Sequence, residues 1–463
     1  MICFAESNYT KVIINSKIQS HYYLCLKHCE RVKGVMNLKY GLEDRPPLKE
    51  NLIFGLQWLA VTIPAVIILG KVLGSMEGSM AAEILYMQKL FAVMAVSLLI
   101  QIWWGHRLPL VIGPATVLLI GILASQTSSS AAIYSSILIC GLILSILAVS
   151  GLFAYLRQLF TPRVVAVILL LVAFTMLPTI LKLISSSSGQ MSSASHLGFA
   201  LVFIILMFMG QRWLTGLWKA TLILWAMIFG SLAYFLINPG WAKGVDATSV
   251  PFLGGFFQQL TTGIVIDPGL LIAFLLCFLG LAINDLGSIQ AVGSVLQADE
   301  MPKRITQGIT STGLGNVLAG FMGVIGPVNF SFSPGVIAST GCAARTTLIP
   351  AGIIMLALAF TPRILFYLSF IPGVVIGCVL LFIMCTQVAA GLAAAFSAIK
   401  QPYFDYALPI GLPILIGIMV AFMPAEVLAA FPAAVRPILG NGFVMGVLVA
   451  LLLEHMIFSN SKG

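Results

Sequence analysis

The stretch from Gly320 to Gly335 constrains the fold of this chain more than any other. Its 16 residues, GFMGVIGPVNFSFSPG, contain four glycines and two prolines and lie between apolar segments. Proline has no amide hydrogen and glycine lowers helix propensity, so the stretch cannot be one regular helix. In a membrane, broken backbone survives only where it is buried in protein or lines a cavity, and such breaks point to a transporter's binding site. A proline-kinked helix or a loop between helices is the alternative, which the stretch alone leaves open.

The composition is that of a polytopic membrane protein. Hydrophobic residues make up 60% of the 463 residues and charged residues only 8%, whereas a soluble domain has about 25% charged residues. The net charge of +9 does not indicate nucleic-acid binding, because the basic residues are spread along the chain as the loops between membrane spans require. The small cluster of Cys25, His28 and Cys29 has no second pair and does not predict a metal site.

We expect an all-α protein with fourteen transmembrane segments. Each apolar run is near the roughly 20 residues that span a bilayer, or is a shorter or broken version. The runs are 52–70, 84–104, 108–124, 132–153, 164–184, 196–210, 217–237, 268–292, 305–322, 329–341, 346–360, 372–392, 407–424 and 435–458. The third and tenth are interrupted, by Gly113-Pro114 and by Pro327 with Pro334.

Residues 1–35 are polar and basic and lack the apolar core of a signal peptide. Met36 opens a segment that leads straight into the first apolar run. We therefore expect residues 1–35 to be an extension upstream of the natural start or a disordered tail, with a functional tail as the alternative. Residues 36–463 would form the membrane protein.

The distribution of basic residues predicts cytoplasmic N- and C-termini in the plasma (inner) membrane. With the N-terminus inside, nine basic residues fall on the cytoplasmic side and five on the opposite side, as the positive-inside rule requires. The nine are Arg107, Arg157, Arg163, Arg212, Lys219, Lys303, Arg304, Arg345 and Lys400, and the five are Lys71, Lys182, Lys243, Arg363 and Arg436.

Two short motifs recur in the same order. Val-Ile-Gly-Pro occurs at 111–114 and 324–327, and Phe-Thr-Pro-Arg occurs at 160–163 and 360–363, at offsets of 213 and 200 residues. Both pairs fit a repeat of seven spans plus seven. Because seven is odd, the second half must be inverted in the membrane, which is a plan of secondary transporters with paired broken helices 3 and 10.

Asp285 stands out among the 15 acidic residues because it lies within the eighth apolar run, while nearly all others are at run ends or in loops. A carboxylate at this depth costs at least about 2.5 kcal/mol and marks a functional site by default. We expect Asp285 to couple transport to a proton, and a structural acid paired with a basic residue is the alternative. Asn284 offers a donor and an acceptor to a planar ligand, and Ser288 shares its helix face; both could instead bond neighbouring helices.

The broken segments supply the other candidate substrate-binding residues. Phe332 could stack on a flat ligand, although aromatic residues in a bundle more often pack. Ser333 and the amides near Gly335 are plausible polar contacts, and Thr116 follows the matching break in the third run. Trp58 in the first run is more often interior packing. No nucleotide-binding loop or nucleophile elbow occurs, so the sequence predicts neither an ATP-driven pump nor an enzyme, and no cofactor.

From Met36 onward the chain resembles the nucleobase–ascorbate transporter family, the xanthine/uracil permeases. The segments that carry the resemblance are LKYGLEDRPPLKENLIFGLQW, GHRLPLVIG at 105–113, KRITQG at 303–308 and, most specifically, GVIASTG at 335–341. The last is similar to the family signature's glycine, four residues, threonine and a basic residue or glycine.

The resemblance implies fourteen spans in two inverted halves. It implies a core domain over about 52–153 and 268–360, and a gate domain over about 164–237 and 372–458. Such permeases typically form homodimers and move the core against the gate, coupled to H+ or Na+. Their ligand lies between helix eight and broken helices three and ten.

The ligand shell departs from the family pattern. The family's glutamate in helix eight falls on Asn284, and its second polar position falls on Ser288. The glutamine or glutamate of the helix-ten signature and the following asparagine fall on Phe332 and Ser333, and the histidine common in helix one falls on Trp58. Asp285 is one residue from the usual glutamate.

The sequence therefore predicts a cation-coupled importer of a purine or pyrimidine base that works by alternating access. An anion or other small-solute carrier on the same scaffold is the first alternative, because loss of the glutamates would admit anions to helix N-termini. A membrane sensor that no longer transports is the second alternative.

Overall fold

The computed structural model describes residues 38–126, 128–153, 155, 158–185, 193–238, 250–331, 333–398, 404–432 and 435–458. The chain divides into two units, Met1–Lys39 and Tyr40–Gly463. Every helix and strand of the described residues belongs to the second unit. The predicted N-terminal extension at 1–35 lies outside the described residues.

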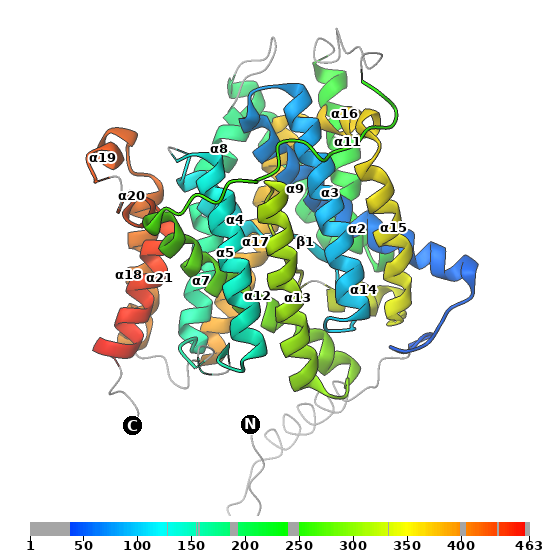
Figure 1. Cartoon of the computed structure of the whole chain (residues 1–463). Helices are drawn as coiled ribbons and strands as arrows, with labels where there is room; N and C mark the ends of the chain where they lie inside the picture. The colour runs from blue at the N-terminus through cyan, green and yellow to red at the C-terminus, as the bar shows by residue number, and fades with distance from the viewer. Residues whose placement is uncertain are drawn as a thin grey trace, which may run out of the picture. The chain divides into compact units, whose positions relative to one another are not determined.

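The described part of the second unit is mostly helical, with one short strand pair (Figure 1). Its longer helices are α2 (Leu48–Gly74), α3 (Met80–Trp103), α4 (Thr116–Ala124), α5 (Ser130–Val149), α7 (Pro162–Thr175), α8 (Leu177–Ser185), α9 (Ser193–Trp213), α11 (Leu222–Ile237), α12 (Pro268–Leu296), α13 (Met301–Met322), α14 (Ser333–Thr340), α15 (Leu348–Ala359), α16 (Pro362–Ser369), α17 (Gly373–Ala398), α18 (Phe404–Ala421) and α21 (Gly442–Leu452). The short elements are η1 (Ser75–Glu77), α10 (Gly216–Ala220), η3 (Arg345–Thr347), α19 (Ala425–Ala429), α20 (Arg436–Leu439) and the π-helical turn η4 (Leu453–Ile457).

Every predicted apolar run contains a helix among the described residues, but several runs are divided. Seven helices in the described part of the chain are long and apolar enough to cross a membrane. A further candidate span is a bent pair, in which Arg345–Ala359 and Pro362–Ser369 meet at 90°. The run expected at 164–184 is two consecutive helices, α7 and α8. Pro178 stands in the first turn of α8, where its missing amide hydrogen is tolerated.

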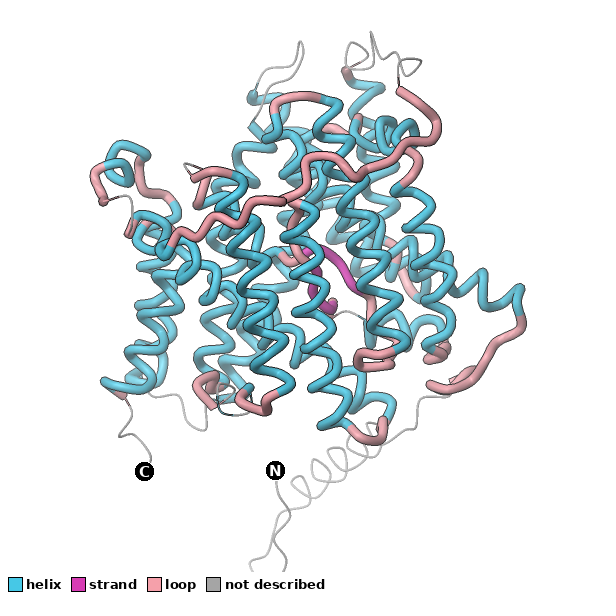
Figure 2. The backbone as a smooth tube through the Cα atoms, viewed as in Figure 1, coloured by secondary structure: helices cyan, strands magenta, loops and turns pink. Residues whose placement is uncertain are grey.

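The breaks in the third and tenth runs are confirmed, and the two broken segments meet. Each begins with a three-residue strand, β1 (Ile112–Pro114) or β2 (Pro327–Asn329), and continues as α4 or α14. The strands pair antiparallel, with Ile112 opposite Asn329 and Pro114 opposite Pro327. Figure 2 shows the pair among the helices, and all six strand residues are buried. The end of the first Val-Ile-Gly-Pro copy thus pairs with Pro327, the end of the second copy, and with the two residues that follow it. The two strands thereby satisfy part of each other's backbone, as broken backbone away from water requires.

The helices pack in two groups. In the first, α13 packs against α5 and α3, while α2 and α15 pack against α3. In the second, α17 packs against α7, α8 and α9, while α18 and α21 pack against α7. α12 belongs to the first group through α5 and α13, and it also touches α20 and α21 of the second. Small residues allow the closest approach: a Cβ on Gly141 of α5 would lie 2.8 Å from the Gly313 carbonyl of α13.

Candidate functional site

Asn329, the last residue of β2, is held by three residues from neighbouring turns of α12. Its amide N–H and its Nδ2 both donate to Asp285 Oδ1, at 2.9 and 2.6 Å. Its carbonyl oxygen accepts from Ser288 Oγ at 3.0 Å and from Asn284 Nδ2 at 3.3 Å. Asn284 and Asp285 are adjacent and point in different directions from the helix, yet both reach this one residue because the strand end lies between them.

Asp285 is fully buried and its carboxylate is met by neutral donors. Besides the two bonds from Asn329, Thr312 Oγ1 of α13 donates to Oδ2 at 2.7 Å. Gln101 Nε2 of α3 in turn donates to Thr312 Oγ1 at 2.9 Å. Within the described residues no lysine or arginine forms an ion pair with Asp285. The geometry therefore does not support the alternative in which Asp285 is a structural acid paired with a basic residue. Three elements, α12, α13 and β2, therefore meet at one carboxylate, and α3 joins them through Thr312.

His106 extends this network toward one end of the protein. Its Nδ1 accepts the Leu108 amide hydrogen at 2.9 Å, and its Nε2 lies 3.1 Å from Asn329 Oδ1. A ring nitrogen that accepts carries no proton, so the imidazole is neutral with its hydrogen on Nε2, donating to Asn329. In this chain of hydrogen bonds, His106 donates to Asn329 and Asn329 donates to Asp285.

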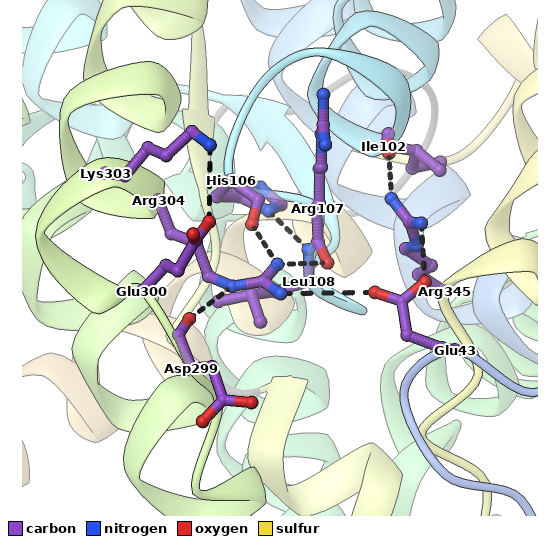
Figure 3. A network of polar contacts seen from close by, with 10 residues as sticks. All are labelled: Glu43, Ile102, His106, Arg107, Leu108, Asp299, Glu300, Lys303, Arg304 and Arg345. Carbon is purple, nitrogen blue, oxygen red and sulfur yellow. Dashed lines mark hydrogen bonds and ion pairs between the residues drawn. The ribbon is translucent and has the colours of Figure 1, made fainter.

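Arg304 of α13 fixes the loop that carries His106 (Figure 3). Its Nη1 donates to the carbonyls of His106 and Arg107, both at 3.0 Å. Arg107 has φ +55°, a left-handed conformation that a non-glycine residue adopts only where the surroundings hold it. Arg304 also lies 4.0 Å from Glu43, which makes a 2.6 Å ion pair with Arg345. This surface cluster therefore supports the buried network through the backbone.

The α12 face that holds Gly280, Asn284 and Gly287 becomes accessible toward the C-terminal end of the helix. A Cβ on Gly280 would lie 3.0 Å from the Phe443 ring of α21 and 3.6 Å from Ile168 of α7, so the two helix groups touch there. Two turns further on, Gly287 is exposed and a Cβ there would meet nothing within 4 Å. Asn284, between them, is half-buried. The face is closed at Gly280 and open at Gly287.

Phe330 flanks the same region from the strand side. It follows Asn329 and is half-buried. A Cβ on Gly113 would overlap the Phe330 ring, so the ring lies directly over β1 at the one position that has no side chain. Gly113 permits this close approach.

The other predicted contacts differ in their surroundings. Ser333 is buried and tied to the strands, because its Oγ donates to the Phe330 carbonyl and accepts from the Val111 amide. Thr116 begins α4 and is half-buried, while Gly335 is exposed with open space around it. Trp58 is buried, and its Nε1 donates to Thr347 Oγ1 at 3.0 Å. Phe332 lies outside the described residues. The contacts of these residues with a substrate stay predictions.

The network includes residues that the sequence did not single out for a site. His106 lies in the 105–113 segment that carries the family resemblance, and Asn329 lies in the broken stretch 320–335, but no local pattern shows that they would meet. Thr312 and Gln101 are ordinary polar residues within apolar helices. Polar residues in membrane helices more often face the protein interior than lipid, and that is the one signal they carry. Among the described residues no group of histidine, cysteine, aspartate or glutamate could hold a metal ion.

Comparison with known proteins identifies the family. The sequence model described as "Permease family", that of the xanthine/uracil permeases, matches residues 49–426. The chain belongs to this permease family. A nucleobase transporter, PlUacP of Paenibacillus larvae subsp. larvae, is 25% identical over 431 residues, which cover 89% of this chain and 95% of that protein. The xanthine permease of Bacillus subtilis is 21% identical over 424 residues, again 89% of this chain and 95% of the relative.

The fold of the permease recurs in a solved membrane transporter. The transmembrane domain of a cyanobacterium bicarbonate transporter, BicA, aligns with a TM-score of 0.54 at 14% identity and covers 81% of this chain and 96% of that domain. The match extends to the fold alone. The permease is thus a multi-pass membrane transporter and not an enzyme, as the sequence predicted.

Proposed function

We propose that the permease is a secondary transporter that imports a purine or pyrimidine nucleobase, coupled to a cation, by alternating access. The observation that carries this proposal is the convergence of Asn284, Asp285 and Ser288 of α12 on Asn329, beside an open helix face. The permease family and its nucleobase-transporting relatives support the substrate class.

The substrate would lie against Asn284 and Phe330. A nucleobase is planar, with N–H and C=O groups alternating along its edge, which an amide donor and acceptor can match. The Asn284 side chain is half-buried and its Nδ2 bond to Asn329 is 3.3 Å long, so a base can replace that bond at small cost. The Phe330 ring offers a face for stacking. Thr116 and Gly335 would border the site, and Ser333, Ser288 and Trp58 would shape it from behind.

Asp285 would couple the cation to the substrate. As a carboxylate it accepts two bonds from Asn329. Protonation, or displacement of those donors by Na+, weakens both bonds and releases the end of β2. The same residue takes the Asn284 bond on its carbonyl, so a change at Asp285 reaches the substrate position through Asn329. H+ is the first candidate and Na+ the second.

The architecture would be fourteen spans in two inverted repeats of seven. The equivalent prolines of the two Val-Ile-Gly-Pro copies, Pro114 and Pro327, face each other in the antiparallel strand pair, which supports an inverted relation. The first helix group fits a core domain over about 52–153 and 268–360, and the second a gate domain over about 164–237 and 372–458. We further propose a homodimer in the plasma membrane with cytoplasmic termini, on the positive-inside distribution and the family pattern.

An anion carrier is the competing function, because the fold recurs in a bicarbonate transporter. The buried polar network argues against it. Asp285 places a carboxylate at the site without an ion-paired lysine or arginine among the described residues, and His106 is neutral. A negative site repels an anionic substrate.

The deciding experiment is uptake of labelled uracil, xanthine, hypoxanthine, adenine and guanine. It uses cells that lack their own base permeases, with and without an uncoupler. We expect uptake of at least one base that collapses with the uncoupler. No uptake of any base, with the permease shown to be in the membrane, would overturn the proposal and favour the anion carrier or a non-transporting sensor.

A further inference from the structure

A cavity lies away from the Asn329 network. Its volume is about 410 Å³, within the roughly 300–1,000 Å³ of small-molecule sites. It sits where α3 and α5 begin, next to Gly323 at the end of α13, and residues 259–263 pass over it. That loop belongs to the segment from 250 to 267, which Figure 1 shows crossing one end of the helices. None of the residues that bind Asn329 lines this cavity.

Lys89 of α3 lines the cavity and is almost fully buried, with 4% of its surface exposed. Its ammonium carries three donors, and the bond that holds it is to the Gln259 carbonyl at 3.2 Å. No carboxylate lies within 4.0 Å of it among the described residues. A buried charge is stable only when it is paired. Within the described residues, the Lys89 ammonium therefore faces the cavity without an ion-pair partner.

Two helix N-termini add positive potential at the same place. Ser130 and Ala131 of the first turn of α5 line the cavity, as does Ala82 of the first turn of α3. The amides of Ser130 and Ala131 at the start of α5 have no partner within their own helix, whereas the Ala82 amide of α3 already donates to Ser79 Oγ at 3.2 Å. Each helix dipole is equivalent to about half a positive charge at this end. Together with Lys89 they form a donor set for an anion.

One acidic side chain limits the charge that the cavity accepts. Glu77 of η1 is exposed and lies at the lining, too far from Lys89 for an ion pair. The balance of one lysine, two helix ends and one glutamate suits a single negative charge better than a double one. The volume leaves room for an organic body, and the Tyr86 and Tyr134 side chains in the lining offer it aromatic surface.

We propose that this cavity binds a small organic monoanion, with its carboxylate between the Lys89 ammonium and the first turns of α3 and α5. The site is distinct from the proposed transport site and does not depend on what the permease transports. The cavity wall is also tied to the strand pair, because Tyr86 Oη accepts the Ile325 amide hydrogen at 3.0 Å, two residues before β2.

The test is calorimetric titration of the purified full-length permease with benzoate and, as its neutral analogue, benzamide. We expect saturable benzoate binding, at least tenfold weaker binding of benzamide, and at least tenfold weaker benzoate binding in Lys89→Met, which keeps the apolar stem. Glu77→Gln should tighten benzoate binding several-fold because it removes the nearby negative charge. The matched control is Lys182→Met, a substitution of an exposed lysine on α8, which should bind benzoate as the parent does.

Absence of saturable benzoate binding, or equal binding by Lys89→Met, overturns the proposal. Should Lys89→Met not fold, as judged by its elution volume and thermal midpoint, Lys89→Arg and Glu77→Gln decide. Benzoate binding that is retained in Lys89→Arg and tighter in Glu77→Gln supports the site. Any other result rejects it. Because no uptake is measured, failure here leaves the nucleobase proposal untouched.

Discussion

At the scale of single residues, Asn329 uses all of its polar groups within the protein. Both its donors serve Asp285, its carbonyl accepts from Asn284 and Ser288, and its side-chain oxygen accepts from His106. Buried polar networks of this kind rigidify a site when each member is satisfied, and they fail together when one is lost. The residue joins the half-buried amide of Asn284 to the buried carboxylate of Asp285.

Asp285→Asn should separate coupling from binding. The amide has nearly the shape of the carboxylate but carries no charge and cannot exchange a proton. We expect accumulation against a gradient to be abolished while counterflow exchange of the base persists, both measured in proteoliposomes. The control is Asp299→Asn, at an exposed carboxylate just beyond the end of α12. Unchanged accumulation in Asp285→Asn would dispose of a coupling role.

At the scale of elements, the strand pair depends on the close approach of neighbouring side chains to its glycines. Gly113 of β1 lies directly under the Phe330 ring, and Gly326 faces the Asn316 side chain closely enough that a Cβ would overlap it. Asn316 Nδ2 in turn donates to the Pro327 carbonyl at 3.0 Å. The glycines of both Val-Ile-Gly-Pro copies are thus explained by packing as well as by the break in the helix.

Gly113→Ala should lower base uptake at least tenfold. The added methyl group must displace the Phe330 ring or separate the strands, and either change moves Asn329 relative to α12. Initial uptake rates at equal membrane abundance measure the effect. Gly198→Ala on α9 is the control, since a Cβ there meets nothing within 4 Å. Wild-type uptake by Gly113→Ala would show that the strand pair tolerates the shift and that Phe330 is not held in place there.

At the scale of the whole molecule, α12 lies between the two helix groups. It packs on α5 and α13, and its Gly280 meets Phe443 of α21 and Ile168 of α7. In the proposed alternating access, movement of one group against the other would slide along this contact. The absence of a side chain at Gly280 would keep that surface smooth.

Gly280→Val should therefore slow uptake while substrate binding remains, because its branched side chain wedges against the Phe443 ring. Uptake rates and equilibrium binding of the transported base distinguish the two effects. Adding Phe443→Ala to Gly280→Val removes the wedge and should restore part of the rate. If the double variant is as slow as Gly280→Val, or if binding is lost together with uptake, the contact is not a sliding surface.

The sequence by itself determined the membrane class, the positions of the apolar segments, the two breaks and the family. These are consequences of local properties: hydrophobicity over about 20 residues sets a span, and proline and glycine break it wherever they stand. It also marked Asp285 and Asn284, because a buried acid in an apolar run is costly anywhere.

Only the tertiary structure decided which residues meet. Gln101, His106, Thr312 and Asn329 lie up to 228 residues apart in the chain, and no local pattern distinguishes them from polar residues that join helices. The pairing of Ile112 with Asn329 brings the last strand residue to α12, and that register sets which groups reach Asp285. The cavity at Lys89 likewise depends on packing between distant segments, whose energy is absent from any single stretch of sequence.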